Sequence, residues 1–208
     1  MHSKSGLFIT FEGGDGCGKS TQSRILYQKL LQLNIPCILI QEPGGTPLGI
    51  EVGNLLKTNR QIEIEPLAEL FLFAACRAQI VSEIIKPALD AAKIVLCDRF
   101  ADSTIVYQGF ARGIDLNLVN LINDAATCGL KPDLTILLDI PPQPGLRRKG
   151  NSHSDRFETE DIAFHQRVRE GYLELARREP GRWLVINGEQ TGEMISQIIW
   201  EKVRHLLP

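Results

Sequence analysis

The sequence predicts a doubly wound α/β fold, in which a parallel sheet of five strands has helices on both faces. This prediction rests on five short apolar runs, which lie at residues 7–11, 37–41, 94–97, 134–138 and 183–186. Each run is continuously apolar rather than alternating, which is typical of parallel strands buried on both faces. Longer helical patterns separate the runs, and this strand–helix alternation indicates a parallel sheet covered by helices.

The helical patterns lie at residues 19–33, 47–57, 66–91, 115–127, 158–178 and 191–206. The chain has 208 residues and contains neither an internal repeat nor a linker that would divide it. We therefore predict a single domain over residues 1–208. A polar, irregular stretch interrupts the pattern at residues 149–154, within a segment at about 147–157 that we predict to be a short lid.

Composition narrows the kinds of partner. The formal net charge of −2 argues against a protein that wraps nucleic acid, because such proteins carry a basic excess. The five cysteines are scattered and form no C-x-x-C pair, which favours reduced thiols in the cytoplasm. The first apolar run ends at Glu12 and is too short for a signal peptide or a membrane span. We expect a cytoplasmic protein that binds neither nucleic acid nor membrane.

A glycine-rich segment follows the first predicted strand and opens the first predicted helix. It reads Gly13-Gly14-Asp15-Gly16-Cys17-Gly18-Lys19-Ser20 and fits the P-loop pattern G-x-x-x-x-G-K-[ST]. In such a loop, backbone N–H groups and the positive end of the helix bind phosphate. These eight residues and Thr21 are the candidate ATP-binding set, in which Lys19 reaches the β- and γ-phosphates and Ser20 ligates Mg²⁺.

Two further segments add charges suited to phosphoryl transfer. The third apolar run ends in Asp98-Arg99-Phe100, where Asp98 is a second candidate ligand for Mg²⁺ and Arg99 would neutralise developing charge. The predicted lid begins with three consecutive cations, Arg147, Arg148 and Lys149. All three are candidate catalytic cations, and the sequence leaves open which of them reaches the transferred phosphate.

Several segments together resemble thymidylate kinases of the bacterial type, over nearly the whole chain. They are Phe11-Glu12-Gly13-Gly14-Asp15-Gly16, Glu42-Pro43-Gly44-Gly45-Thr46, Phe73-Ala74-Ala75-Cys76-Arg77-Ala78-Gln79, Asp98-Arg99-Phe100, Tyr107-Gln108-Gly109 and Asp155-Arg156-Phe157-Glu158. The resemblance implies transfer of the γ-phosphoryl group of ATP to dTMP, with Mg²⁺. It also implies a homodimer, for which the apolar helix predicted at 66–91 would supply a face.

The resemblance also implies roles in binding the acceptor. Asp15 would contact the 3′-hydroxyl of the sugar, Phe73 would stack on thymine, and Arg77 would donate to a base carbonyl. Tyr107 would crowd the 2′ position and favour deoxyribose. The full candidate substrate-binding set is Asp15, Glu42, Phe73, Arg77, Arg99, Ser103, Thr104, Tyr107 and Gln108. The lid resembles the version of the family in which a lid residue, rather than a P-loop residue, supplies the catalytic arginine.

Two positions depart from the family pattern. Gln41 and Gly53 stand where the family usually has arginines, the second of which grips the acceptor phosphate. We therefore expect that Gly53→Arg tightens dTMP binding by about tenfold, the gain from one well-formed charge-assisted contact. Lys57 and Arg60 are alternative cations for the same role.

Three other functions remain open at this stage. One is a P-loop kinase for a different nucleotide or a deoxynucleoside. Another is a nucleotide-dependent switch, although no guanine-reading Asn-Lys-x-Asp follows the run at 134–138. The third is a relative that binds nucleotides without catalysis.

Overall fold

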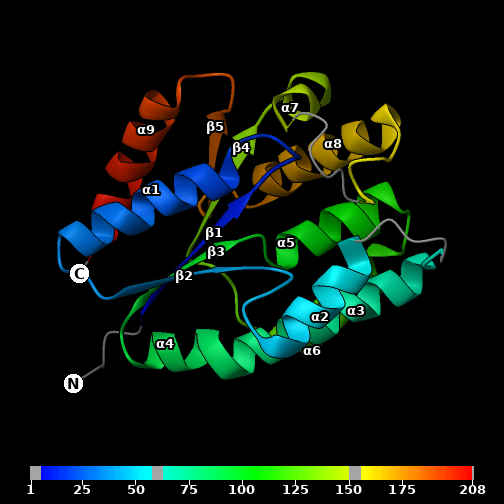
Figure 1. Cartoon of the computed structure of the whole chain (residues 1–208), viewed down its shortest axis with the longest axis horizontal. Coiled ribbons are helices and arrows are strands. Elements are labelled where there is room, and N and C mark those ends of the chain that lie inside the picture. The colour runs from blue at the N-terminus through cyan, green and yellow to red at the C-terminus, as the bar shows by residue number, and fades with distance from the viewer. Residues whose placement is uncertain (1–5, 58–62, 150–155, 208) are drawn as a thin grey trace.

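The computed structural model describes residues 6–57, 63–149 and 156–207, without the side chain of Lys149. Within these ranges the chain forms the predicted five-stranded parallel sheet, in the order β2-β3-β1-β4-β5 (Figure 1). The strands are β1 (Leu7–Glu12), β2 (Cys37–Gln41), β3 (Ile94–Asp98), β4 (Leu134–Asp139) and β5 (Trp183–Asn187). All five strands begin at the predicted residue, and the predicted fold class is confirmed.

The predicted helices are present with small changes of boundary. They are α1 (Lys19–Gln32), α2 (Pro47–Lys57), α3 (Pro66–Ile80), α6 (Leu116–Thr127), α8 (Ile162–Arg178) and α9 (Gly192–Arg204). Helix α3 continues through a π-helical segment, η1 (Val81–Ile85), into α4 (Lys86–Asp90). Helix α8 begins four residues later than the predicted 158, because the Asp161 side chain caps it by accepting from the Phe164 N–H at 2.6 Å.

The sequence patterns missed two helical segments. One is α5 (Ala101–Thr104) with the π-helical segment η2 (Ile105–Ala111), and the other is α7 (Pro142–Lys149). The first is rich in β-branched residues and contains Gly109, and the second contains two prolines and Gly145. Such residues have low helix propensity, so tertiary packing decides these helices. Residues 147–149, at the start of the predicted lid, form the last turn of α7.

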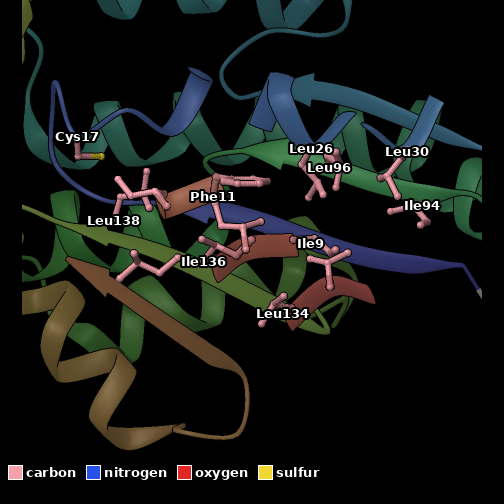
Figure 2. Packing of buried hydrophobic residues seen from close by; sticks show 14 of the residues in the cluster. Ile9, Phe11, Cys17, Leu26, Leu30, Ile94, Leu96, Leu134, Ile136 and Leu138 are labelled. Carbon is pink, nitrogen blue, oxygen red and sulfur yellow. The ribbon is translucent and has the colours of Figure 1, made fainter. Parts of the chain in front are cut away.

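Alternate residues of the strands enter separate cores on the two faces of the sheet. On one face, Ile9 and Phe11 of β1 and Ile136 of β4 pack beneath Leu26 and Leu30 of α1, as Figure 2 shows. A second set packs on the opposite face against η1 and α4, and it includes Phe8, Val95, Cys97 and Ile85. Both faces of the central strands are therefore buried, which explains their continuously apolar sequences.

At the carboxyl edge of the sheet, the strand order places the loop after β1 beside the loop after β3. From central β1 the chain moves first to β2 and β3 on one side, and later to β4 and β5 on the other. Ligands bind at such a switch point in doubly wound sheets. The register pairs Phe11 of β1 with Asp98 of β3, so the loops that follow these strands are neighbours. Across the described ranges, no helix is both long and apolar enough to cross a membrane.

Candidate active site

The glycine-rich segment forms a tight loop between β1 and α1. Gly16 and Gly18 have φ angles of 70° and 98°, in the left-handed region that favours glycine. A Cβ atom on Gly16 would also lie 1.9 Å from the backbone oxygen of Gly145, so the loop could not pack against α7 with any other residue there. Gly18 ends the loop as the N-cap of α1, whose first N–H groups face the space where an anion would bind.

The Lys19 side chain lies back across this loop. Its Nζ donates to the carbonyl oxygens of Gly13 and Gly14 at 2.9 and 2.8 Å. The side chain is buried, yet it lines a cavity of about 370 Å³ at the carboxyl edge of the sheet. The ammonium group is therefore held at the mouth of the phosphate loop.

The two predicted Mg²⁺ ligands meet across the switch point. The Ser20 hydroxyl donates to the Asp98 carboxylate at 2.5 Å, and both residues line the cavity. This pair of oxygens fits Mg²⁺, which binds proteins through one or two carboxylates and takes its other ligands from phosphate and water. Consistent with that sparse ligand set, the described residues contain no cluster of three or more His, Cys, Asp or Glu side chains suited to a metal.

Arg99 crosses from the end of β3 to the phosphate loop. Its Nη2 pairs with Asp15 at 2.9 Å, and its Nη1 donates to the Gly13 carbonyl at 3.3 Å. The guanidinium also lies 5.0 Å from the centre of the Tyr107 ring. Burial by itself lowers the pKa of Arg99. A larger, opposite effect comes from the Tyr107 and Tyr172 hydroxyls and the Asp15 and Glu12 carboxyls, so the Arg99 pKa is raised. Arg99 therefore stays charged next to the loop.

An aromatic pocket forms the other half of the same cavity. Phe73 of α3, Tyr107 of η2 and Phe157 line it, and the Phe157 ring lies 5.9 Å from the Phe73 ring and 6.0 Å from the Tyr107 ring. The predicted residues Asp15, Glu42, Arg77, Arg99, Ser103, Thr104 and Gln108 also line the cavity. The structure thus brings the whole candidate substrate-binding set into one place.

Arg77 is more constrained than the sequence suggested. Its guanidinium pairs with Glu42 at 2.8 Å and donates to the side chains of Thr104 and Asn123 at 2.8 and 2.9 Å, and to the Phe100 carbonyl at 3.1 Å. Its Nε also donates to Glu42 at 2.9 Å, so all three of its nitrogens are directed at protein oxygens. Arg77 ties α3 to β2, α5 and α6, so it shapes the polar end of the pocket as well as lining it.

The structure separates the predicted lid cations. Arg148 lines the cavity and donates to the Gly188 carbonyl at 2.8 Å, whereas Arg147 does not line the cavity. The Lys149 side chain and residues 150–155 lie outside the described part of the chain. Beyond that segment, Arg156 turns away to form an ion pair with Glu69.

Helix α2 reaches the cavity at its C-terminal end. Gly53 is buried against the Pro43 backbone and does not line the cavity, whereas Lys57, one turn further along α2, does. Gln41 and Pro43 line the same region. Lys57 therefore lines the cavity where Gly53 does not, and Arg60 lies outside the described residues.

Four residues at the site were not among the sequence candidates. Glu12 and Phe157 both belong to segments that resemble the kinase family, so the resemblance offered a signal for them. Lys57 was considered only as a substitute cation. Tyr172 lies in the middle of the amphipathic helix α8, and no sequence pattern distinguishes it from an ordinary core residue.

A phosphate loop, a Ser–Asp oxygen pair and an aromatic pocket in one cavity define the protein as a P-loop kinase that acts on a small acceptor. The family model for thymidylate kinase matches residues 11–199. A thymidylate kinase of Dehalococcoides mccartyi is 49% identical over 201 residues, which cover 97% of each chain. One of Geotalea daltonii is 48% identical over 191 residues, 88% of this chain and 89% of that relative.

A solved structure agrees with these sequence relatives. The crystal structure of thymidylate kinase from Ehrlichia chaffeensis superposes with a TM-score of 0.77 at 36% identity, over 98% of this chain and 99% of that one. The chain belongs to the thymidylate kinase family, whose members phosphorylate dTMP to dTDP with ATP.

Proposed function

We propose that this chain transfers the γ-phosphoryl group of ATP to dTMP, giving ADP and dTDP. The observation that carries the proposal is a single cavity of about 370 Å³ that joins the phosphate loop to the aromatic pocket. A donor phosphate on the loop and an acceptor in the pocket would face each other within it. Holding two reactants in this way supplies much of the rate enhancement in phosphoryl transfer.

The donor half would hold ATP by its phosphates. Backbone N–H groups from Gly13 to Thr21 and the ammonium group of Lys19 suit the β- and γ-phosphates. Ser20 and Asp98 would hold Mg²⁺, which when bound neutralises phosphate charge. Arg99 adds a fixed positive charge beside the loop.

The acceptor half would select thymine. Phe73 and Phe157 offer ring faces for stacking, and Arg77, Thr104 and Gln108 form a polar edge for the base. Asp15 and Tyr107 would contact the sugar. We assign the lid contribution to transition-state charge to Arg148, because it lines the cavity from the last turn of α7, with Arg147 and Lys149 as the other candidates.

A coupled assay of ADP release tests this function. Turnover with dTMP should exceed turnover with other nucleoside monophosphates and with thymidine, and omitting the acceptor should abolish it. Preference for another nucleotide or a deoxynucleoside would indicate a different P-loop kinase. ATP binding without ADP release from any acceptor would indicate a binding-only relative.

Lys57 is our candidate for gripping the acceptor phosphate, since it lines the end of the cavity beside Gln41 and Pro43. We expect Lys57→Ala to weaken dTMP binding by about tenfold, the value of one charge-assisted contact. Thymidine, which has no phosphate, should bind both proteins equally. Calorimetric titration of dTMP and thymidine measures both affinities, and an equal loss for thymidine would contradict a phosphate contact.

The arginine expected at position 53 would meet a packing constraint. A Cβ atom on Gly53 would lie 3.3 Å from the Pro43 oxygen and 3.4 Å from its ring carbons, so Pro43 would have to shift slightly. The prediction that Gly53→Arg tightens dTMP binding therefore needs Gly53→Ala as its control. A gain in affinity that Gly53→Ala shares would come from the helix backbone and not from the guanidinium.

We also propose that the chain forms a homodimer through α2, α3 and α6. Leu67 and Phe71 share one exposed face of α3, and Leu118 and Leu121 share one on α6, which packs against α3. Phe71 and Leu121 are 54% and 67% exposed, and a contiguous patch of exposed apolar side chains can mark a contact with another chain. Apolar faces of adjacent helices suit a second copy, because a twofold axis pairs each face with its own equivalent.

Sedimentation tests the dimer. We expect the wild type to sediment as a dimer and the double variant Phe71→Glu/Leu121→Glu to sediment as a folded monomer, since buried carboxylates oppose association. Met194→Glu, at a similarly exposed position on α9, is the matched control and should remain dimeric. A monomeric wild type would contradict the proposal.

We place the reaction in the cytoplasm. All five cysteines are unpaired, which suits a reducing compartment. The proposed acceptor is a small molecule, and the net charge of −2 offers nucleic acid no general attraction.

A further inference from the structure

Glu12 is the last residue of β1, and its carboxylate is completely buried. It accepts three hydrogen bonds from three separate segments. The Phe100 N–H donates to Oε1 at 2.8 Å, and the hydroxyls of Ser103 and Tyr172 donate to Oε2 at 2.6 and 2.8 Å. Glu12 therefore ties the start of the phosphate loop to the turn after β3, to α5 and to α8.

The same two hydroxyls contact Arg99. Its Nη1 lies 3.4 Å from the Ser103 oxygen and 3.3 Å from the Tyr172 oxygen. A hydroxyl has one hydrogen, so a hydroxyl that donates to Glu12 can only accept from Arg99. The Ser103 and Tyr172 oxygens also lie 2.8 Å apart, so one hydroxyl can donate to the other instead of to Glu12 directly. In either arrangement both hydrogens are directed away from Arg99, and both oxygens accept from its guanidinium.

Glu12 also supports the backbone around Arg99. Arg99 has a φ angle of 70°, in the left-handed region, and a non-glycine residue keeps that conformation only when its surroundings hold it. The Arg99 N–H donates to the Phe11 carbonyl at 3.0 Å, and the next N–H, that of Phe100, donates to Glu12. Two successive residues of β1 therefore accept hydrogen bonds from the turn that contains Arg99.

We propose that Glu12 is a positioning residue for phosphoryl transfer, which aims the Arg99 guanidinium through Ser103, Tyr172 and the Phe100 N–H without touching either substrate. The expected effect of Glu12 on turnover rests on the proposed function. The arrangement of Arg99 that it explains can also be measured without turnover.

The ionisation of Glu12 provides a distinctive readout. Burial raises the pKa of its carboxyl from 4.5 to about 7, and the charge of Asp102 adds to the rise. The groups that face it from the surrounding elements are Asp102, Ser103, Arg99, Tyr172 and Cys97. When Glu12 binds a proton it becomes a donor itself, so the hydroxyls lose their fixed direction. We expect wild-type kcat to fall as the pH drops through about 7.

Glu12→Gln is the sharpest test, because the amide keeps one acceptor for Phe100 and replaces the other with a donor. The Ser103 and Tyr172 hydroxyls would then accept from Gln and point their hydrogens elsewhere. We expect kcat to fall by about tenfold to a hundredfold, the scale on which misplaced catalytic groups lose rate. The KM values for ATP and dTMP should change little, and the limb near pH 7 should disappear from the kcat profile.

Stability distinguishes positioning from a structural role. A raised pKa in the folded state means that Glu12 stabilises the fold at low pH and that this contribution is lost as the pH rises from 4.5 through about 7. The glutamine variant has no such loss, so at about pH 8 it should be at least as stable as the wild type. Lower stability together with raised KM values would show that Glu12 is merely structural and would overturn the proposal.

Two measurements keep the test independent of folding and of turnover. Tyr172→Phe removes one intermediary, so it should lower kcat without raising KM, and its effect should not add to that of Glu12→Gln in a double-mutant cycle. In spectra of ¹⁵N-labelled arginine, hindered rotation should resolve the Arg99 Nη signals in the wild type but not in Glu12→Gln. Unchanged kcat in Tyr172→Phe, or unchanged Arg99 signals in Glu12→Gln, would overturn the proposal.

Discussion

Lys19→Ala should lower kcat by about 10²–10³ while the protein remains folded, the usual loss when one preorganised charge is removed from a closed active site. The structure gives the reason. The Lys19 ammonium is buried at the mouth of the phosphate loop and is held there by the carbonyls of Gly13 and Gly14. It is therefore positioned to meet phosphate charge without reorganising. Steady-state ADP release and circular dichroism measure the two halves of this expectation.

Lys93→Ala is the control for Lys19→Ala, because Lys93 is exposed just before β3 and far along that strand from its carboxyl end. It removes the same charge from the chain and should leave turnover unchanged. Near-normal turnover of a folded Lys19→Ala protein would mean that the loop does not bind the transferred phosphate.

Arg99→Ala should lower kcat by about 10²–10³ and raise the KM for ATP far less, because we propose that Arg99 stabilises charge that develops during transfer. Its guanidinium already forms an ion pair with Asp15 and a hydrogen bond with the Gly13 carbonyl. These two contacts limit how strongly Arg99 can also bind the donor phosphate in the ground state. Measured kcat and KM values at saturating dTMP separate the two effects.

Arg99→Lys is the matched variant, since it retains the charge but lacks the planar fork that reaches Asp15 through Nη2 and Ser103 and Tyr172 through Nη1. We expect it to recover only part of the lost kcat. A variant at position 99 whose defect lies wholly in the KM for ATP would assign Arg99 to substrate binding.

The sequence alone was sufficient to locate the sheet and to propose the donor half of the site. Continuous apolar runs located all five strands, because a parallel strand buried on both faces is apolar at nearly every position. The phosphate loop was equally clear, since its glycines and its Lys19-Ser20 pair are required at fixed spacing by the backbone that cradles phosphate. Asp98 and Arg99 followed because they come directly after a strand.

The acceptor pocket depended on the family resemblance. Residues from β2, α3, α5 and η2 are far apart in the chain, and local patterns do not say that they meet. The sequence did not predict a helix for the segment with Ser103, Thr104, Tyr107 and Gln108, because its residues have low helix propensity. In the structure, this segment is helical because it packs against α6 and α8.

Charge alone could not assign the cations. Arg147 and Arg148 are adjacent in sequence, yet only Arg148 lines the cavity, because neighbouring residues of a helix point in different directions. Arg156, which follows the predicted lid cations in sequence, is paired with Glu69. Lys57 lines the cavity while Gly53 meets Pro43, a distinction set by how closely α2 packs.

The sequence by itself determined the fold class, the phosphate loop and the charges at the end of β3, because each depends on residues that are local or periodic in the chain. Only the tertiary structure decided that all three nitrogens of Arg77 donate to protein oxygens. It alone also decided that Glu12 accepts from the Ser103 and Tyr172 hydroxyls beside Arg99. Both networks join strands and helices that are far apart in sequence. Hydrogen bonds require distances near 3 Å, and no local sequence pattern sets such distances between remote segments.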